Sequence, residues 1–197
     1  MELPRQAVHQ GTVSLTTERL TLRRFKHQDA AAAYKNWMSD PVVTTYLTWP
    51  PHKSLQSAQA IIDMWIENYA KADFYQWAIC LKDSPEPIGS ISTVDANDNV
   101  GMVQIGYCLG RAWQNSGLMS EALRRVIAFF FDDVGINRVE SRHDPNNPAS
   151  GKVMLKAGMT YEGTQRQADR SNQGIVDTSF YAIVAADYFG TQTANPT

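Results

Sequence analysis

WQNSGLMSEALRRVIAFFF, residues 113–131, joins a polar, glycine-bearing turn to an amphipathic helix, and this junction decides the fold. We predict a helix over 118–134, because its apolar residues recur every three or four positions. The first turn of a helix exposes N–H groups that no helical carbonyl accepts, and the helix dipole adds positive charge there. Residues 114–120, called the amide turn below, therefore indicate a site for an anion such as a phosphate.

Two common phosphate-binding motifs are absent from this region. No Gly-Lys-Ser/Thr occurs, which excludes a Walker-type loop, and no G-x-G-x-x-G follows a strand, which excludes a Rossmann fingerprint. On the amide turn alone a simpler interpretation stays open, in which Gly117 serves only a loop and Ser120 caps the helix.

Strands and helices alternate around this junction. Strands are predicted at 17–25, 75–82, 88–94, 101–109, 137–143, 159–169 and 175–187, and helices at 28–40, 54–72, 118–134 and 147–158. Asp29, Ser54 and Asn147 are expected to cap their helices, and Pro148 and Gly158 to mark the start and end of the last one. A helix between strands 101–109 and 137–143 implies a parallel pair. The predicted fold class is α/β, an α+β mixed sheet with helices on both faces.

Composition narrows the class of protein. The chain has 197 residues and 19% charged residues, which favours one globular domain, and its net charge of −2 argues against nucleic acid as a partner. Cys80 and Cys108 are far apart and fit neither a disulfide framework nor a Cys-rich zinc site, so we expect a reducing cytoplasm. The four histidines lack ligand spacing, and no metal site is expected.

The ends of the chain carry no targeting signal that we recognise. No stretch reaches the length of a membrane span, and MELPRQAVHQG lacks the apolar run of a secretory signal, so no membrane partner is expected. Residues 1–14 and 189–197 are predicted to be loose termini around a single domain at 15–188.

Two stretches together resemble the GCN5-related N-acetyltransferase (GNAT) superfamily. They are IGYCLGRAWQNSGLMSEAL, residues 105–123, and NRVESRHDPNNPASGKVMLKAGMTYEG, residues 137–163. The subgroup they resemble most is that of the ribosomal-protein serine and alanine N-acetyltransferases, and the resemblance covers about 15–188. It implies a mostly antiparallel sheet with one splayed parallel strand pair. A homodimer is common in this subgroup, and no residue of the sequence tests that expectation.

The resemblance implies acetyl-coenzyme A as co-substrate and suggests where it binds. In the family pattern Gln/Arg-x-x-Gly-x-Gly/Ala, Asn115 stands where many members have glycine, and Met119 departs from the last position. Asn147 would meet the pantetheine arm, or simply cap its helix. The full set implied for the cofactor is Tyr107, Cys108 and Leu109 at the thioester, Gln114, Asn115, Ser116, Gly117, Leu118, Met119 and Ser120 at the pyrophosphate, and Asn147 and Ser150. Plain strand core is the alternative for Tyr107, Cys108 and Leu109.

The catalytic groups are less clear, because Met154 stands where many family members have a tyrosine acid. The resemblance implies Ser150 instead, which would bond the sulfur or a water, paired with a carboxylate. Asp169 is the candidate carboxylate and Glu162 its rival, and both could equally be solvated turn residues. Direct transfer is expected, since no Ser-His-Asp or Cys-His arrangement is evident.

These features lead to one function and several alternatives. The leading hypothesis is acetyl transfer from acetyl-CoA to a protein N-terminal α-amine, with segments 44–53 and 164–174 selecting the acceptor. Tyr46, Trp49 and His52 would wall the slot for a peptide end, although Trp49 could simply staple a loop to the core. The alternatives are a small-molecule amine acceptor, such as a polyamine, amino acid or drug, a non-catalytic acyl-CoA-binding protein, and a phosphate binder of another fold.

Overall fold

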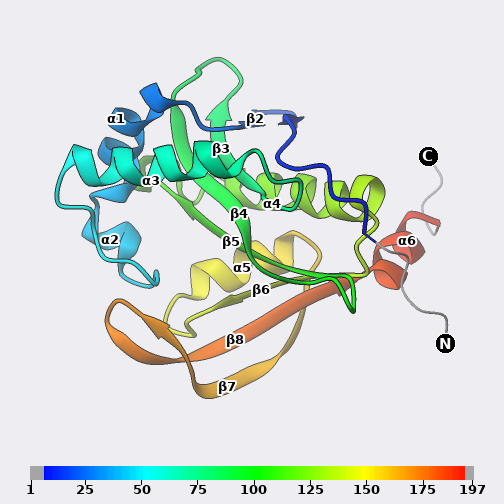
Figure 1. Ribbon diagram of the computed structural model, residues 1–197. Helices are drawn as coiled ribbons and strands as arrows, with labels where there is room; N and C mark the ends of the chain where they lie inside the picture. The colour runs from blue at the N-terminus through cyan, green and yellow to red at the C-terminus, as the bar shows by residue number, and fades with distance from the viewer. Residues whose placement is uncertain (1–6, 194–197) are drawn as a thin grey trace.

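The computed structural model describes residues 7–193 and is built around one mixed sheet (Figure 1). The strands are β1 (Leu15–Thr16), β2 (Leu20–Arg23), β3 (Gln76–Leu81), β4 (Pro87–Asn97), β5 (Met102–Leu109), β6 (Arg138–His143), β7 (Thr160–Ser171) and β8 (Gly174–Val184). The eight strands lie in the order β1-β2-β3-β4-β5-β6-β8-β7. All neighbours are antiparallel except β5 and β6, so the predicted fold class and parallel pair are confirmed.

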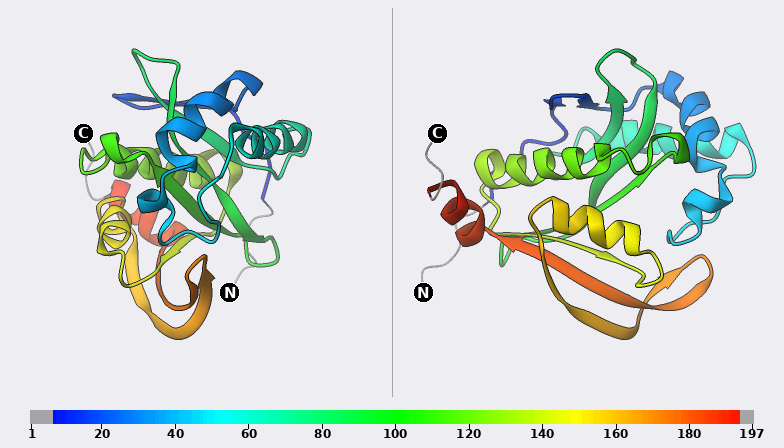
Figure 2. Two further views of the ribbon diagram at one scale, coloured as in Figure 1. Left: turned by 90° about the vertical axis from the view of Figure 1, so that its left-hand side faces the viewer. Right: turned by 180° about the vertical axis from the view of Figure 1, so that it is seen from behind.

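Helices cover both faces of the sheet, as Figure 2 shows from two sides. They are α1 (Ala30–Ala33), α2 (Pro41–Thr44), α3 (Leu55–Asn68), α4 (Leu118–Phe129), α5 (Pro148–Lys156) and α6 (Ala185–Thr193), with the short 3-10 or π turns η1 (His27–Asp29), η2 (Tyr34–Met38), η3 (Arg111–Trp113) and η4 (Phe130–Val134). Alternation along β3 shows the two layers. Trp77 and Ile79 belong to the core beneath α4 and α5, whereas Ala78 and Cys80 pack with α1 and α3.

The parallel strands separate along their length. Their register runs only from Met102 opposite Arg138 to Gln104 opposite Glu140. Beyond that point β5 stays paired with β4 through Leu109, and β6 stays paired with β8 through His143. The strands therefore diverge toward their carboxyl ends, as the resemblance implied. The ladder between them stops there, and Ser141 Oγ of β6 donates to the Ile105 carbonyl of β5 at 2.7 Å.

Local capping agrees with the sequence in one case and not in another. Ser54 caps α3 as predicted, because its Oγ accepts a bond from the Ser57 amide at 3.2 Å. The prediction that Asp29 caps a helix is wrong. Its carboxylate is held instead by the Arg23 guanidinium, at 2.7 and 2.9 Å, and by the Lys26 amide at 2.8 Å.

The predicted loose termini fall partly outside the described residues, since 1–6 and 194–197 are not described. Inside the described range, the Val8 amide donates to the Val134 carbonyl and Thr12 Oγ1 donates to the Phe74 carbonyl. The helix α6 continues to Thr193. Across residues 7–193, none of the helices has the length and apolar character to cross a membrane.

Candidate active site

The amide turn has the backbone conformation that an anion site needs. Asn115 and Gly117 both adopt positive φ, 59° and 80°, and Gly117 is the N-cap of α4. Gly117 offers no side chain to cap the helix, and the first helical bond runs from the Glu121 amide to the Gly117 carbonyl. The amides of 118–120 are therefore left for a ligand. The simpler interpretation of Ser120 as the cap is wrong, because Ser120 is buried within the first turn.

Side chains behind the amide turn hold it in place. Gln114 Nε2 donates to the Leu109 carbonyl at 2.8 Å, which ties the turn to the end of β5. Arg19 Nη1 donates to the Ser116 carbonyl at 3.0 Å, and Arg19 Nε donates to Glu121 Oε2 at 2.7 Å. Sequence reasoning missed Arg19 and Glu121, because 102 positions separate them. Their ion pair places a guanidinium directly behind a predicted anion site.

A cavity of about 470 Å³ runs from the amide turn into the gap between β5 and β6 and on to α2. It brings together most of the residues predicted for the cofactor: Tyr107, Cys108, Leu109, Gln114, Asn115, Gly117, Leu118, Met119, Ser120, Asn147 and Ser150. Ser116 is outside the lining, and so are both predicted carboxylates, Glu162 and Asp169. The cavity also takes in Val43, Tyr46 and Leu47 from the segment around α2.

Two hydroxyl groups meet in the middle of this cavity. Tyr107 Oη lies 2.9 Å from Ser150 Oγ, and it donates to the Ser150 carbonyl at 3.0 Å. Burial raises the pKa of Tyr107, so the phenol stays protonated at any physiological pH. Met154, one turn further along α5, is buried in the core and offers no proton.

Cys108 lies beside Tyr107 on β5 but faces the other side of the sheet. Its Sγ is 3.4 Å from Ser90 Oγ, and it packs against the core under α1 and α3. Burial raises the pKa of the Cys108 thiol. A thiol that resists ionisation is a poor nucleophile, so this environment favours direct transfer over an acyl-enzyme on Cys108.

The first turn of α5 supplies the other polar groups of the cavity. Pro148 occupies the first helical position as predicted and Asn147 the N-cap, but the Asn147 side chain does not cap the helix. That part of the prediction is wrong, and Asn147 lines the cavity.

His143, at the end of β6, is a cavity residue that sequence reasoning passed over. His143 Nδ1 lies 2.8 Å from the Asp144 carbonyl, and because a carbonyl only accepts, Nδ1 carries the proton. Nε2 is buried with no hydrogen-bond partner among residues 7–193. It faces Gly151, where an added Cβ would come within 2.8 Å of it.

Both predicted carboxylates are held by arginines on β6. Glu162 is bound by Arg138, whose Nη1 lies 2.8 Å from Glu162 Oε1, and this bond lowers the pKa of Glu162. Asp169 Oδ2 lies 3.0 Å from Arg142 Nε. Arg142 itself lines the cavity, so Asp169 is one side chain removed from it.

Of the three residues predicted to wall an acceptor slot, one lies at the cavity and two do not. Tyr46 lines the cavity, whereas Trp49 and His52 do not. Trp49 packs against the core under α1 and α3, and its ring centroid lies 5.6 Å from that of His52. Burial lowers the pKa of His52, whose Nδ1 lies 3.0 Å from Ser57 Oγ. Trp49 thus anchors the 44–53 segment to the core, which is the alternative role predicted for it from the sequence.

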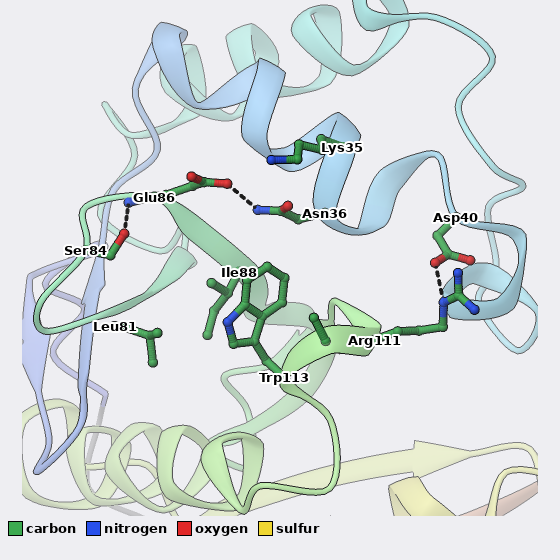
Figure 3. A pocket seen from close by; sticks show the side chains of 10 residues that line it. Lys35, Asn36, Asp40, Leu81, Ser84, Glu86, Ile88, Arg111 and Trp113 are labelled. Atoms are coloured by element: carbon green, nitrogen blue, oxygen red, sulfur yellow. Dashed lines mark hydrogen bonds and ion pairs between the residues drawn. The ribbon is translucent and has the colours of Figure 1, made fainter.

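A second hollow of about 550 Å³ lies on the far side of Trp113, between η2 and the start of β4 (Figure 3). Polar side chains in its lining bond to one another: Arg111 Nε lies 2.6 Å from Asp40 Oδ2, and Asn36 Nδ2 donates to Glu86 Oε1 at 2.9 Å. Within the described part of the chain, no three His, Cys, Asp or Glu side chains gather in a way that could hold a metal ion.

A splayed sheet with an amide turn at the mouth of the gap defines an acyl-CoA-type transferase, and comparison with known proteins identifies the family. Residues 19–160 match the acetyltransferase (GNAT) domain, so the chain belongs to the GNAT family and is an N-acetyltransferase. It is 29% identical over 177 residues to the uncharacterized N-acetyltransferase p20 of Bacillus licheniformis, covering 90% of this chain and 99% of that protein.

Two further relatives carry more specific names. The chain is 29% identical over 163 residues to the [ribosomal protein uS5]-alanine N-acetyltransferase of Escherichia coli, covering 77% of this chain and 80% of that one. The solved structure of RimL, a ribosomal L7/L12 alpha-N-protein acetyltransferase in complex with coenzyme A, superposes with a TM-score of 0.78 at 21% identity. That match covers 87% of this chain and 98% of RimL, and it shows the shared fold.

Proposed function

We propose that this N-acetyltransferase transfers acetyl from acetyl-CoA directly to a protein N-terminal α-amine, within a catalytic domain spanning 15–188. The observation that carries the proposal is the single cavity that joins the amide turn, the gap between β5 and β6, and the segment around α2. A donor and an acceptor can therefore meet in one enclosed space, next to the hydroxyls of Tyr107 and Ser150.

The cofactor would lie along this cavity with its phosphates at the amide turn. The free amides of 118–120 and the positive end of α4 suit a pyrophosphate, and Lys152 and Lys156 line the same cavity. The pantetheine arm would pair with the unpaired edge of β5 as an added strand, within reach of the Asn147 amide. The thioester would then reach Tyr107, Cys108 and Leu109, with its sulfur near Ser150.

The chemistry forms an N–C bond and breaks a C–S bond. One proton leaves the ammonium before attack, and a second leaves the nitrogen as the tetrahedral intermediate collapses and goes to the departing thiolate, so CoA leaves as the thiol. The thiolate must be stabilised until it takes up that proton. We assign stabilisation of the leaving sulfur to Ser150. When Tyr107 Oη turns its proton from the Ser150 carbonyl to Ser150 Oγ, 2.9 Å away, the Ser150 hydroxyl is free to donate to the sulfur. Backbone amides at the end of β5 would bind the oxyanion of the tetrahedral intermediate. Cys108 takes no covalent part.

Deprotonation of the amine needs no strong base, since an α-amino group has a pKa of about 7.7–8.0 and is partly neutral already. Of the two carboxylates, Asp169 is the better candidate, because its partner Arg142 lines the cavity. Arg138 lowers the pKa of Glu162 and holds it outside the cavity lining, which makes Glu162 the weaker candidate. We infer that Asp169 accepts the proton through water and that Arg142 positions it.

Charge and shape of the cavity favour a peptide end over a polycation. The acceptor side is walled by the apolar Val43, Tyr46 and Leu47. Arg142 and Lys152 line the cavity, and among residues 7–193 the only carboxylate in its lining is Asp144, whose Oδ1 accepts bonds from Asn146. A polyamine would meet repulsion here, whereas a peptide presents one amine and a neutral backbone. The name of the Escherichia coli relative, an alanine N-acetyltransferase of a ribosomal protein, supports the same acceptor class.

Calorimetric titration with acetyl-CoA, and with free CoA for comparison, is the first test. We expect saturable binding of both, followed by acetylation of peptides with free N-termini in preference to spermidine or amino acids. Preference for a small amine would favour the alternative hypothesis of a small-molecule amine acceptor. Binding without transfer to any amine would identify an acyl-CoA-binding protein.

Cys80 and Cys108 are free thiols, which suits the cytoplasmic setting we propose, where ribosomal proteins are available.

A further inference from the structure

The tip of the β7–β8 hairpin touches the segment that follows α2. Figures 1 and 2 show the hairpin reaching back toward that segment across the open end of the sheet. The contact is made by Asn172, whose Nδ2 lies 2.6 Å from the Thr44 carbonyl, 3.0 Å from the Leu47 carbonyl and 3.1 Å from the Trp49 carbonyl. The Asn172 backbone amide also donates to the Leu47 carbonyl at 2.9 Å. We call this set of bonds the Asn172 clasp.

Few side chains could replace asparagine in the clasp. Three carbonyl oxygens converge on one NH₂ group, so the group at their centre must be a donor, and its two protons are shared among them. An aspartate of the same shape would present oxygen atoms to three carbonyls and repel them. An alanine would leave only the backbone bond to Leu47. The side chain is half-buried, which limits competition from water.

The clasp holds a wall of the cavity. The 44–49 backbone that it grips carries Tyr46 and Leu47, and both line the cavity on the acceptor side, together with Val43. Tyr46 is 40% exposed, so packing alone does not fix it, and its position depends on the backbone beneath. Asn172, Thr44 and Trp49 themselves lie outside the lining of the cavity, and Leu47 lines it.

We propose that Asn172 is a positioning residue for acceptor specificity, which locks the Tyr46–Leu47 wall against the β7–β8 hairpin and so fixes the width of the acceptor slot. This inference rests on the proposed function, because it presumes that an amine acceptor enters beside Tyr46. A fixed, narrow slot admits the extended end of a chain and excludes a branched or bulky amine. When the clasp opens, the preferred acceptor is held less well and wider acceptors gain access.

The test compares Asn172→Ala and Asn172→Asp with a control, Asn68→Ala. Asn68 Nδ2 also donates to a main-chain carbonyl, that of Met64 at 2.8 Å, but on the exposed end of α3. We expect Asn172→Ala to raise KM for the peptide roughly tenfold, the effect of losing about one to two net hydrogen bonds. Turnover at saturating peptide and the affinity for acetyl-CoA stay at wild-type values. Asn172→Asp shows the larger rise, and the control shows none.

Two further measurements separate specificity from general damage. Hydrogen exchange of the amides in 44–49 should speed up in both Asn172 variants, while exchange in α4 is unchanged. In the Asn172 variants, kcat/KM for a peptide with a bulky N-terminal residue should rise relative to kcat/KM for a peptide with a small one. If Asn172→Asp does not fold, Asn172→Ala and Asn172→Ser carry the test.

Several results would overturn the inference. An unchanged KM for peptide in Asn172→Ala refutes it, and so does an equal loss of acetyl-CoA affinity, which would mean that the clasp supports the whole fold. Failure of the proposed function looks different, since wild-type protein would then bind acetyl-CoA and acetylate no peptide. In that case unchanged exchange in 44–49 of the Asn172 variants would still refute the clasp.

Discussion

Replacing Tyr107 by phenylalanine tests the assignment of the leaving-group donor most directly. The change removes one oxygen atom that bonds both Ser150 Oγ, at 2.9 Å, and the Ser150 carbonyl, at 3.0 Å. A net intramolecular hydrogen bond contributes about 0.5–1.5 kcal/mol, so the loss of both destabilises the fold by about 1–3 kcal/mol. That cost leaves a typical domain of this size folded at room temperature.

The effect on turnover should exceed the effect on binding. Ser150 Oγ would lose its partner and its orientation toward the sulfur, while the amide turn would be untouched. We expect kcat to fall about 10–100-fold, equivalent to roughly 1.4–2.7 kcal/mol of transition-state stabilisation, with the acetyl-CoA dissociation constant unchanged. Thiol release measures kcat, and calorimetry measures the affinity.

A matched control and a double mutant sharpen this test. Tyr161→Phe removes a tyrosine hydroxyl that bonds Thr164 Oγ1 at 2.8 Å on the exposed face of β7, outside the cavity, and should leave kcat at the wild-type value. If Tyr107 acts through Ser150, then Ser150→Ala should lower kcat without changing the affinity for acetyl-CoA. The variant that carries both Tyr107→Phe and Ser150→Ala should then be no slower than the slower single variant. Additive losses would refute a shared path, and an unchanged kcat in Tyr107→Phe would refute the assignment itself.

The remaining predictions concern separate parts of the site. Gly117→Asp should abolish calorimetric binding of CoA, because it puts a carboxylate among the free amides and strains a backbone held at a φ of 80°; the nearest atom to a new Cβ is the flexible Arg19 Nη2 at 3.5 Å, so a steric clash is not the cause. Cys108→Ala should keep kcat, and a stable acetyl adduct on wild-type Cys108 in mass spectra would contradict direct transfer. Asp169→Asn should lower kcat/KM most at low pH, where less amine is neutral, while Glu162→Gln leaves the pH–rate profile unchanged; the opposite ranking would exchange their roles.

The sequence predicted the local parts of the molecule well. The amide turn, the α4 helix and the parallel strand pair depend on short-range signals, namely Gly117 before a 3.6-residue apolar pattern and a helix between two strands. The helix cap that the sequence missed involves a partner outside the predicted helix. Asp29 is 6 residues from Arg23, and this ion pair replaced the expected helix cap.

Contacts between distant segments account for the rest of the site. Arg19 bonds Glu121, and Asn172 bonds carbonyls more than 120 positions away, so no periodicity or spacing could reveal them. The carboxylates show the same limit: Glu162 and Asp169 look alike in the sequence, and only their arginine partners, Arg138 and Arg142, distinguish them. The role of Trp49 was ambiguous for the same reason, since the core that it packs against lies under α1 and α3 and is built from other segments of the chain.

The position of Met154 explains why the residue that orients the Ser150 hydroxyl comes from β5. Alternation along β5 turns Val103, Ile105, Tyr107 and Leu109 toward the core beneath α4 and α5, so the Tyr107 ring extends toward α5. There its hydroxyl reaches the first turn of the helix, at Ser150, one turn before Met154. The strand thus supplies a second hydroxyl at the leaving-group end of the gap, beside that of Ser150, where Met154 offers none. The raised pKa of Tyr107 gives this arrangement a measurable consequence: no alkaline decline of kcat below pH 10.0, the ordinary phenol value, should arise from Tyr107. A decline that disappears in Tyr107→Phe would show that the phenol ionises during turnover and acts as more than a fixed donor.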